Sequence, residues 1–353
     1  MPSRPTRARA PWPAVLTGLL LLVTAACSSG SDPQNPTVAA SGPLLSPSVP
    51  TPAASVATSG ATTPSSSGPA YATGTLSGPV LAVKIDNTSG ARPRVGLTAA
   101  DVVYVELVEG GLTRLLAIYA SKLPAQVGPV RSARETDAVL LANYGPVAFG
   151  YSGASGYTLG IIRQGTARHV SYDLSGAGYQ RVAGRSAPYN LLASPSALLA
   201  RAGGSTYAGD VGFRFGAAPA GGVPAGGVRT AYPAARIELR WDATARRYLV
   251  STDGRPEVSD GVQVGAASVV VQTVRSTPSS NVDVNGNPTP VLEVVGSGPV
   301  RVLRDGLAFT GTWTRPSPTA PTAFVDGSGA ALTLPQGPVW VLLVPAGQEV
   351  SVG

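Results

Sequence analysis

The chain has 353 residues, of which 43% are hydrophobic and 13% charged, and its 43 glycines and 33 prolines favour a β-rich protein with many turns over a helical bundle or coiled coil. The net charge is +7, and it falls to +4 without Arg4, Arg7 and Arg9 near the N-terminus. An excess this small, spread over a chain this long, excludes the electrostatic pattern of a nucleic-acid-binding protein.

The first 26 residues predict a lipoprotein signal peptide. Three arginines precede the apolar stretch 14–23, which is too short to span a bilayer. Residues 21–27 resemble a bacterial lipobox, in which the cysteine thiol takes a diacylglycerol and becomes the mature N-terminus. Thr24 stands where leucine is more usual, and an ordinary secretory signal cleaved near Ala26 is the alternative. We therefore expect acylated Cys27 to anchor the protein in the cell membrane, on its extracytoplasmic face.

Residues 27–78 predict a disordered tether. Serine, threonine, proline, alanine and glycine dominate this stretch, Asp32 is its one charged residue, and Tyr71 is its one aromatic residue. Such a composition buries too little apolar surface to offset the entropy of ordering. A flexible coil of roughly 50 residues reaches about 40 Å, so the folded part is expected to stand away from the bilayer.

Residues 79–208 predict a mixed α/β domain. Apolar and β-branched runs indicate strands at 80–85, 101–108, 112–120 and 146–151, with Gly110 and Gly111 in a hairpin between the second and third. Capping patterns indicate a helix that opens at Ser132 and ends before Gly145 and another at 195–202, and residues 156–163 suggest a short helix between them.

Residues 209–235 read as a linker, and residues 236–353 as a β-rich C-terminal domain. Strands are expected at 236–241, 247–251, 268–274, 290–295, 300–303, 307–313, 323–325 and 339–344. Turn signals such as Asp305-Gly306 separate many of them. The predicted fold class is therefore α+β: an N-terminal mixed α/β domain followed by a C-terminal antiparallel β sandwich or barrel, behind the tether.

The densest cluster of charge lies between Asp86 and Asp137. Gly128 to Arg134 brings two arginines to a predicted helix N-terminus, where free N–H groups and guanidinium forks suit a carboxylate or a phosphate. A hairpin end nearby places Glu109 close to Arg114. The candidate ligand-binding residues are Arg131, Ser132, Arg134, Glu109, Gly110, Gly111, Arg114, Asn87 and Arg92.

A structural interpretation of the same cluster is equally open. Ser132 and Glu135 would then cap the helix, and the arginines would pair with Glu106, Glu109 or Asp137 to hold strands to helix. Neither interpretation involves a metal or a cofactor. With one cysteine and one histidine, His169, the chain excludes Cys/His zinc sites, Cys–His dyads and disulfide frameworks.

Several motifs together resemble the YerB-like family of bacterial lipoproteins. They include Glu109-Gly110-Gly111-Leu112-Thr113-Arg114, Gly128-Pro129-Val130-Arg131-Ser132-Ala133-Arg134, Pro188-Tyr189-Asn190-Leu191 and Gly337-Pro338-Val339-Trp340. The resemblance implies an N-terminal α/β domain of unknown function and a β-rich C-terminal domain, with no established activity. Tyr189 and Glu257 stand where the resemblance implies that histidine is common, which favours binding over acid–base catalysis here.

Three functions stay open at this level. The preferred one is a membrane-anchored extracytoplasmic lipoprotein that binds an anionic cell-envelope ligand, such as a peptide carboxylate or an anionic polymer, or a partner protein. The second is a hydrolase of a cell-wall glycan that uses two of Asp86, Glu106 and Glu109, which requires two carboxylates in a cleft and one raised pKa. The third is a structural or assembly factor, which requires the arginines to be buried and fully paired.

Overall fold

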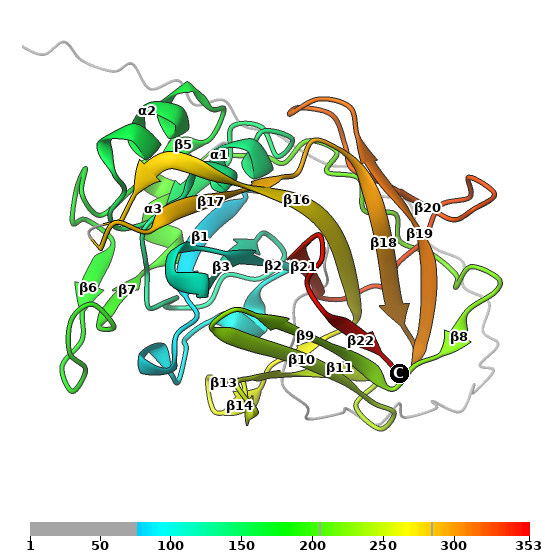
Figure 1. The fold of residues 1–353 in the computed structure, drawn as a ribbon. Coiled ribbons are helices and arrows are strands. Elements are labelled where there is room, and N and C mark those ends of the chain that lie inside the picture. Colours follow the sequence, from blue (N-terminus) through cyan, green and yellow to red (C-terminus); the bar gives the residue numbers. More distant parts are fainter. Residues whose placement is uncertain (1–75, 205, 284) are drawn as a thin grey trace, which may run out of the picture. The chain divides into compact units, whose positions relative to one another are not determined.

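The computed structural model describes residues 76–353, apart from 205 and 284. The predicted signal peptide, Cys27 and nearly all of the predicted tether lie outside the described residues. Residues Ser65–Gly353 form one compact unit, whose described part is drawn in colour in Figure 1. Among the described residues, no helix has the length and apolar character needed to cross a membrane.

The N-terminal half of this unit alternates strands and helices. Its elements are β1 (Leu81–Asp86), β2 (Val102–Leu107), β3 (Thr113–Tyr119), α1 (Glu135–Leu141), β4 (Ala148–Gly150), α2 (Gly156–Gln164), β5 (Arg168–His169), β6 (Tyr179–Arg181), β7 (Leu191–Ala193) and α3 (Pro195–Arg201). Short 3-10 turns lie at Ser89–Ala91, Leu97–Ala99 and Glu109–Gly111. The expected hairpin is confirmed, because β2 and β3 pair antiparallel around the turn at Glu109–Gly111.

The C-terminal half consists of strands. They are β8 (Val223–Pro224), β9 (Gly227–Tyr232), β10 (Ala235–Asp242), β11 (Arg247–Thr252), β12 (Arg255–Pro256), β13 (Val258–Ser259), β14 (Val262–Gln263), β15 (Gly265–Ala266), β16 (Ser268–Val282), β17 (Pro288–Glu293), β18 (Gly296–Arg304), β19 (Leu307–Arg315), β20 (Ala323–Val325), β21 (Val339–Pro345) and β22 (Val350–Val352). All eight strands expected beyond residue 235 are present, and β8 and β9 occupy part of the stretch that read as a linker.

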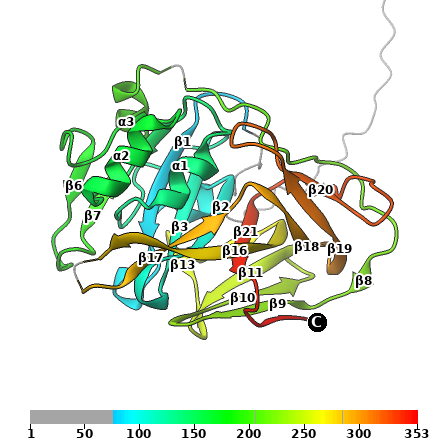
Figure 2. The ribbon, with the colours of Figure 1, turned by 45° about the horizontal axis from the view of Figure 1, so that its top comes forward.

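One twelve-stranded sheet runs through both halves. Its main order is β20-β19-β18-β16-β21-β2-β3-β1-β4-β5. Strand β21 pairs parallel with β2 on one side and with β16 on the other, so Val339 lies opposite both Val102 and Ser268 (Figures 1 and 2). The last strand of the large sheet in sequence therefore joins the two predicted domains at its centre.

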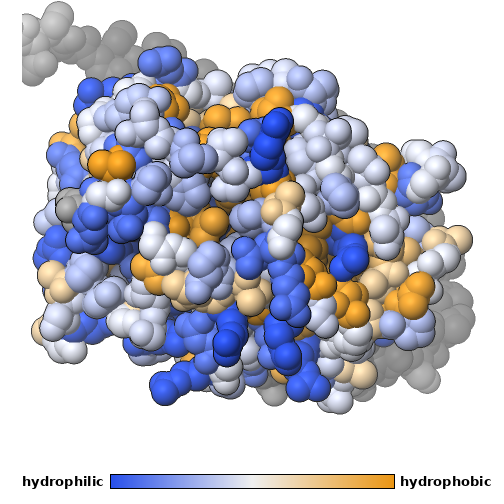
Figure 3. All heavy atoms as spheres, in the orientation of Figure 1, coloured by the Kyte–Doolittle hydropathy of each residue, from blue (hydrophilic) through white to orange (hydrophobic). Residues whose placement is uncertain are grey.

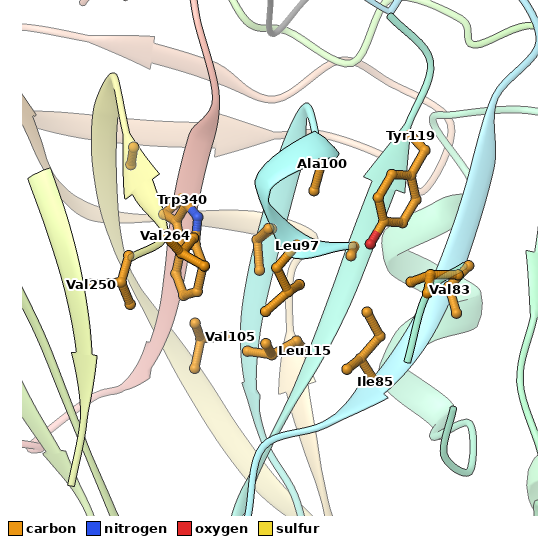
Figure 4. Close-up of a cluster of buried hydrophobic side chains, with 14 of the residues drawn as sticks. Val83, Ile85, Leu97, Ala100, Val105, Leu115, Tyr119, Val250, Val264 and Trp340 are labelled. Carbon is orange, nitrogen blue, oxygen red and sulfur yellow. The ribbon is translucent and has the colours of Figure 1, made fainter. Parts of the chain in front are cut away.

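A smaller six-stranded sheet, with the main order β12-β11-β10-β9-β22, packs on one face of the large sheet. Figure 4 shows Val250 and Val264 from the C-terminal half near Trp340 of β21, with Val105 and Leu115 of the large sheet in the same core. The opposite face of the large sheet carries α1 and α2 through a second core.

The outer side of the six-stranded sheet is polar. In β10, exposed Arg236 and Arg240 alternate with buried Ile237 and Leu239, the period of two expected for a strand with one buried face. Strongly hydrophilic residues accordingly gather over the lower part of the face shown in Figure 3, where Figure 1 places β9 to β11.

The C-terminal strands form neither a closed barrel nor a separate antiparallel sandwich, so that part of the fold prediction is wrong. Every residue of β21, Val339–Pro345, is buried. A continuous apolar run suits a central strand covered on both faces, which can pair parallel as well as antiparallel. The α+β class holds in its coarse form, with strand as the dominant element.

The first helix starts later than expected. Strand-like backbone continues through Arg134, and α1 begins at Glu135. The Asp137 carboxylate accepts a hydrogen bond from the Arg134 backbone N–H at 2.6 Å, and the Ser132 side chain does not cap the helix. The N-cap therefore lies two residues later than the capping pattern predicts.

A buried ion pair joins the two halves beside the large sheet. Arg94 is fully buried, its Nη1 donates to Glu257, and its Nε donates to the Asp86 carbonyl oxygen at 2.7 Å. Burial lowers the pKa of Arg94, and the Glu257 carboxylate opposes that effect. Glu257 is itself 1% exposed, so each charge has the other as its compensation.

We predict that Arg94→Leu lowers the free energy of unfolding by about 3–5 kcal/mol, because it leaves the Glu257 carboxylate buried without its cation. Urea unfolding of the purified protein measures the change. The matched control is the double substitution Arg94→Leu with Glu257→Leu, which removes both charges and should regain most of the loss. A single variant as stable as the parent would show that the ion pair does not hold the halves together.

Candidate anion-binding site

A cleft of about 510 Å³ opens where β1 ends and β3 begins, beside the segment that precedes α1. Its lining consists of Asp86, Thr88, Val108, Glu109, Leu112, Thr113, Arg114, Arg131, Ser132, Arg134, Ala154, Ser155, Thr158, Asn281, Val282, Asp283 and Asn285. Five of the nine residues predicted to bind a ligand meet in this lining: Glu109, Arg114, Arg131, Ser132 and Arg134. The cleft therefore gathers the charged core of the predicted site.

The other four predicted residues lie around the cleft rather than in its lining. Asn87 donates from Nδ2 to Thr113 Oγ1 at 2.8 Å, and Arg92 pairs with Asp253 at 2.8 Å. Gly110 and Gly111 form the tight turn, both with positive φ. A side chain at Gly111 would also collide with Pro233, since an added Cβ would lie 2.6 Å from its Cβ.

Strand register places charged residues side by side at the floor of the cleft. Arg114 of β3 lies directly opposite Asp86 of β1 and Glu106 of β2. Cross-strand partners share a face of the sheet, and Lys84 joins them because it lies two residues before Asp86. The antiparallel pairing of three neighbouring strands thus brings four ionisable groups onto one face, beneath α1.

Asp86 is occupied by its neighbours. Its Oδ2 accepts from Arg131 Nε at 2.7 Å, and its Oδ1 accepts from the Thr88 backbone N–H at 2.6 Å and from Thr88 Oγ1 at 2.5 Å. The Asp86 side chain is 2% exposed, whereas that of Arg131 is 25% exposed. Asp86 therefore fixes Arg131 through Nε and leaves its two terminal nitrogens without a hydrogen-bond acceptor among the described residues.

Glu109 is occupied in the same way. Its Oε2 accepts from Nε and Nη2 of Arg134 at 2.7 and 2.6 Å, and its Oε1 accepts from Thr289 Oγ1 at 2.5 Å. Arg134 Nη1 donates to the Ala133 carbonyl oxygen at 2.8 Å. Burial raises the pKa of Glu109, but the hydrogen bonds and charge of Arg134 outweigh burial, and the net shift is downward. All three nitrogens of Arg134 are thus engaged.

Arg114 differs from the other two arginines. Its Nη1 donates to the Ser132 carbonyl oxygen at 2.8 Å, and no carboxylate of the described residues lies within 4.0 Å of its guanidinium nitrogens. Burial, followed by the nearby charges of Arg134 and Arg131, lowers the pKa of Arg114 to about 9. The third carboxylate of the lining, Asp283, accepts hydrogen bonds from its own hairpin turn. Arg114 is therefore a cation without a counter-ion of its own.

A buried ionic triad lies under the cleft. Lys84 Nζ donates to Glu106 Oε2 and to Asp137 Oδ1, each at 2.7 Å, and all three side chains are at most 1% exposed. Burial and the adjacent Asp137 raise the pKa of Glu106 to about 8. Sequence reasoning missed Lys84, although a lone lysine in the apolar run 80–85 is a usable signal for a buried, paired cation.

The C-terminal half closes one side of the cleft. We call the paired segments Arg275 to Val282 of β16 and Pro288 to Glu293 of β17 the arm; it runs beside α1 (Figure 1). From it, Thr289 reaches Glu109, Ser279 Oγ donates to Glu135 Oε1 at 2.7 Å, and Asn281 faces Thr158 at 3.4 Å. These arm residues were missed because short polar side chains on a strand look like an exposed face.

The described residues do not supply the pair of groups that a carboxylate hydrolase requires. Two carboxylates of the cleft, Asp86 at the end of β1 and Glu109 in the turn after β2, are each held by an arginine, and the pKa of Glu109 is lowered. Glu106 has the raised pKa, but it is 1% exposed and is not part of the lining. Nor does any group of three or more His, Cys, Asp or Glu side chains within residues 76–353, apart from 205 and 284, suit a metal ion.

A two-part, mixed-sheet protein with an arginine-lined cleft is the class that these features define. Residues 68–208 match the N-terminal domain, and residues 228–341 the C-terminal domain, of a family described as protein of unknown function (DUF3048). The chain belongs to this family, and the resemblance to YerB-like proteins predicted from its motifs is confirmed.

YerB of Bacillus subtilis illustrates the similarity in sequence and in structure. "Putative lipoprotein YerB" of Bacillus subtilis (strain 168) is 39% identical over 111 residues, which are 31% of this chain and 33% of that protein, so the match spans about a third of the relative's length. The crystal structure of YerB protein from Bacillus subtilis covers 78% of this chain and 94% of its own, with a TM-score of 0.67 and 24% identity. This second likeness shows a shared fold.

The raised pKa of Glu106 predicts how stability depends on pH. The pKa of Glu106 is about 8 in the folded protein, above the ordinary glutamate value of 4.5, so the folded protein keeps the Glu106 proton between these two pH values. The contribution of Glu106 to the stability of the fold is therefore greatest at low pH and is lost as pH rises toward 8. We expect the melting temperature to fall over this range and Glu106→Gln to flatten the fall. Thermal melts between pH 5 and 9 measure it. Glu109→Gln, which removes a carboxyl with a lowered pKa, is the control. In this variant the melting temperature should still fall as pH rises toward 8. An equally steep fall in Glu106→Gln would contradict the assignment.

Proposed function

We propose that this protein is a membrane-anchored lipoprotein of the cell envelope whose cleft binds an anionic ligand, with Arg114 as the principal charge contact. The observation that carries the proposal is the pairing pattern of the three arginines. Arg131 and Arg134 each hold a carboxylate, while Arg114 has none among the described residues. Removing a guanidinium from water is costly unless an anion compensates it, and a ligand anion in the cleft would do so.

The arrangement also separates the roles of the predicted residues. Arg134 has no free nitrogen, so its role is to hold Glu109 and the start of α1. Arg131 is fixed by Asp86 through Nε and offers its terminal nitrogens to a ligand. Ser132 contributes its carbonyl oxygen to Arg114, which sets the guanidinium in the cleft. Binding is thus assigned to Arg114 and Arg131, and positioning to Asp86, Glu109 and Arg134.

The geometry favours binding over the two alternatives. A structural network would leave every arginine paired and no cleft, whereas this cleft measures about 510 Å³ and one of its arginines lacks a carboxylate partner. A hydrolase needs an acid with a raised pKa in contact with substrate, and the Asp86 and Glu109 carboxylates of the cleft each pair with an arginine. An anion-binding site needs only positively charged hydrogen-bond donors, and Arg114 and Arg131 supply them.

Anchoring is supported by the lipobox-like sequence that ends at Cys27 and by a relative described as a lipoprotein. Under this proposal a diacylglycerol, linked to Cys27 through a thioether, holds the protein at the extracytoplasmic face of the membrane. The tether then lets the cleft reach envelope components within about 40 Å.

Arg114→Met should weaken binding of inorganic phosphate or acetate by at least about tenfold, because it removes the cleft guanidinium that has no carboxylate partner among the described residues. Its melting temperature should stay level or rise, since an uncompensated cation is lost. Calorimetric titration and thermal melts of the full-length protein in detergent measure both effects. The matched variant is Arg134→Met, which leaves the Glu109 carboxylate without its cation and should lower the melting temperature. Unchanged anion affinity in Arg114→Met would overturn the proposal.

Cys27→Ala should abolish lipid attachment, because no thiol is left to form the thioether. We expect the protein to remain unprocessed or to leave the membrane fraction, as measured by fractionation and mass spectrometry of the N-terminus. Ser28→Ala, which keeps the thiol, should behave like the parent. Membrane retention of Cys27→Ala after normal cleavage near Ala26 would refute the lipid anchor.

A further inference from the structure

We infer that the anion bound at Arg114 is the phosphate group of an acyclic polyol, such as a glycerol phosphate unit; this rests on the proposed function and specifies its ligand. Three features of the cleft carry the inference: the number and arrangement of open donors, the chemistry of the remaining lining, and the room beside the arginines.

Two guanidinium groups offer open nitrogens to the same space. Among the described residues, Nε and Nη2 of Arg114 and both terminal nitrogens of Arg131 have no hydrogen-bond acceptor. The two groups come from different elements, strand β3 and the segment before α1. A planar carboxylate lies in the plane of one guanidinium fork, whereas a tetrahedral phosphate directs its oxygens out of a single plane and can accept from two forks that come from different elements. Two open forks therefore favour phosphate.

Hydroxyl and amide groups make up much of the other lining. These are Thr88, Thr113, Ser132, Ser155, Thr158, Asn281 and Asn285. Ser132 is the best placed, because its carbonyl oxygen already holds Arg114 and its Oγ makes no hydrogen bond with a described residue. A hydroxyl so close to the bound anion suits a second polar group on the same ligand, as the neighbouring hydroxyl of a polyol phosphate provides.

The apolar part of the lining is small and carries no ring. It consists of Val108, Leu112, Ala154 and Val282, and Leu112 and Val282 are 38% and 51% exposed. Bases and pyranose rings are usually held by stacking on aromatic side chains, and none belongs to the described lining. The cleft is thus poorly suited to a nucleotide or a ring-stacked sugar, and better suited to an open-chain polyol.

The size of the cleft agrees with a ligand larger than the anion itself. At about 510 Å³ it falls in the range of roughly 300–1,000 Å³ that holds small organic molecules. A lone phosphate would fill a small part of this volume and would not need the wall formed by Ser155, Thr158 and Asn281, whose side chains hydrogen-bond to one another. A polyol chain extending from Arg114 toward this wall would engage both ends of the cleft.

The test is calorimetric titration of the full-length protein in detergent with sn-glycerol 3-phosphate, inorganic phosphate, glycerol and N-acetyl-D-alanyl-D-alanine. We expect glycerol phosphate to bind at least about tenfold more tightly than inorganic phosphate, and glycerol alone not to bind. Ser132→Ala should weaken glycerol phosphate by about three- to fivefold and leave inorganic phosphate unchanged. Ser196→Ala, on the exposed side of α3, is the matched control.

The outcomes separate this inference from the proposed function. If inorganic phosphate and glycerol phosphate bind equally and both depend on Arg114, anion binding stands and the polyol is wrong. If the dipeptide binds most tightly, the ligand is a peptide carboxylate and the phosphate is wrong. If no anion binds, both proposals fall.

Polyol phosphate has two sources in an envelope, a phosphodiester-linked polymer and a lipid headgroup. Competition against glycerol phosphate distinguishes them, with a short poly(glycerol phosphate) chain in one arm and dihexanoyl phosphatidylglycerol in the other. Displacement by either competitor supports the inference and names the source. Displacement by neither would overturn it, because the natural phosphodiester would not fit the cleft.

Discussion

The position of β21 between β2 and β16 is the constraint on which the candidate site depends. Its pairing with both neighbours places the two halves of the chain in one sheet and fixes their register. Strand β16 is longer than its partner, and from Arg275 onward it pairs with β17 instead. The arm therefore projects beyond the sheet toward α1, where Thr289 meets Glu109. A cleft whose charges come from the first half thus gains a wall from the second.

The acids near Arg114 are already paired with other cations of the protein, Asp86 with Arg131, Glu109 with Arg134 and Glu106 with Lys84. The register neighbours of Arg114 are Asp86 and Glu106, and either could have paired with it. Asp86 turns instead to Arg131 and Thr88, and Glu106 is drawn beneath the floor by Lys84. Because Glu106 faces a buried environment and its pKa is raised, it adds little negative charge beside Arg114 near neutral pH. Because of these competing contacts, the Arg114 guanidinium has no carboxylate partner among the described residues.

Much of the fold was predictable because each strand carries its own signal of alternating or continuous apolar residues. The cluster of Glu109, Arg114, Arg131 and Arg134 stood out since charge is rare in this chain. Which acid holds which arginine was not predictable, because pairing depends on register and on the arm. Parallel pairing of β21 was equally hidden, since a fully apolar strand fits either direction. Arg92 lies near the cluster in sequence, yet its partner Asp253 comes from the other half.

Two positions of the chain show why binding suits this cleft better than proton transfer. Glu257 and Tyr189 stand where the family resemblance implies histidine, and neither lines the cleft. Glu257 is buried against Arg94, and the Tyr189 ring packs so closely on Gly90 that an added Cβ there would lie 2.7 Å from it. Both side chains therefore stabilise the fold outside the cleft. Apart from the carboxylates that arginines or a turn already hold, the cleft is left with guanidinium, hydroxyl and amide groups. Under the proposed function these fixed donors would recognise an anion without a group that changes protonation near neutral pH.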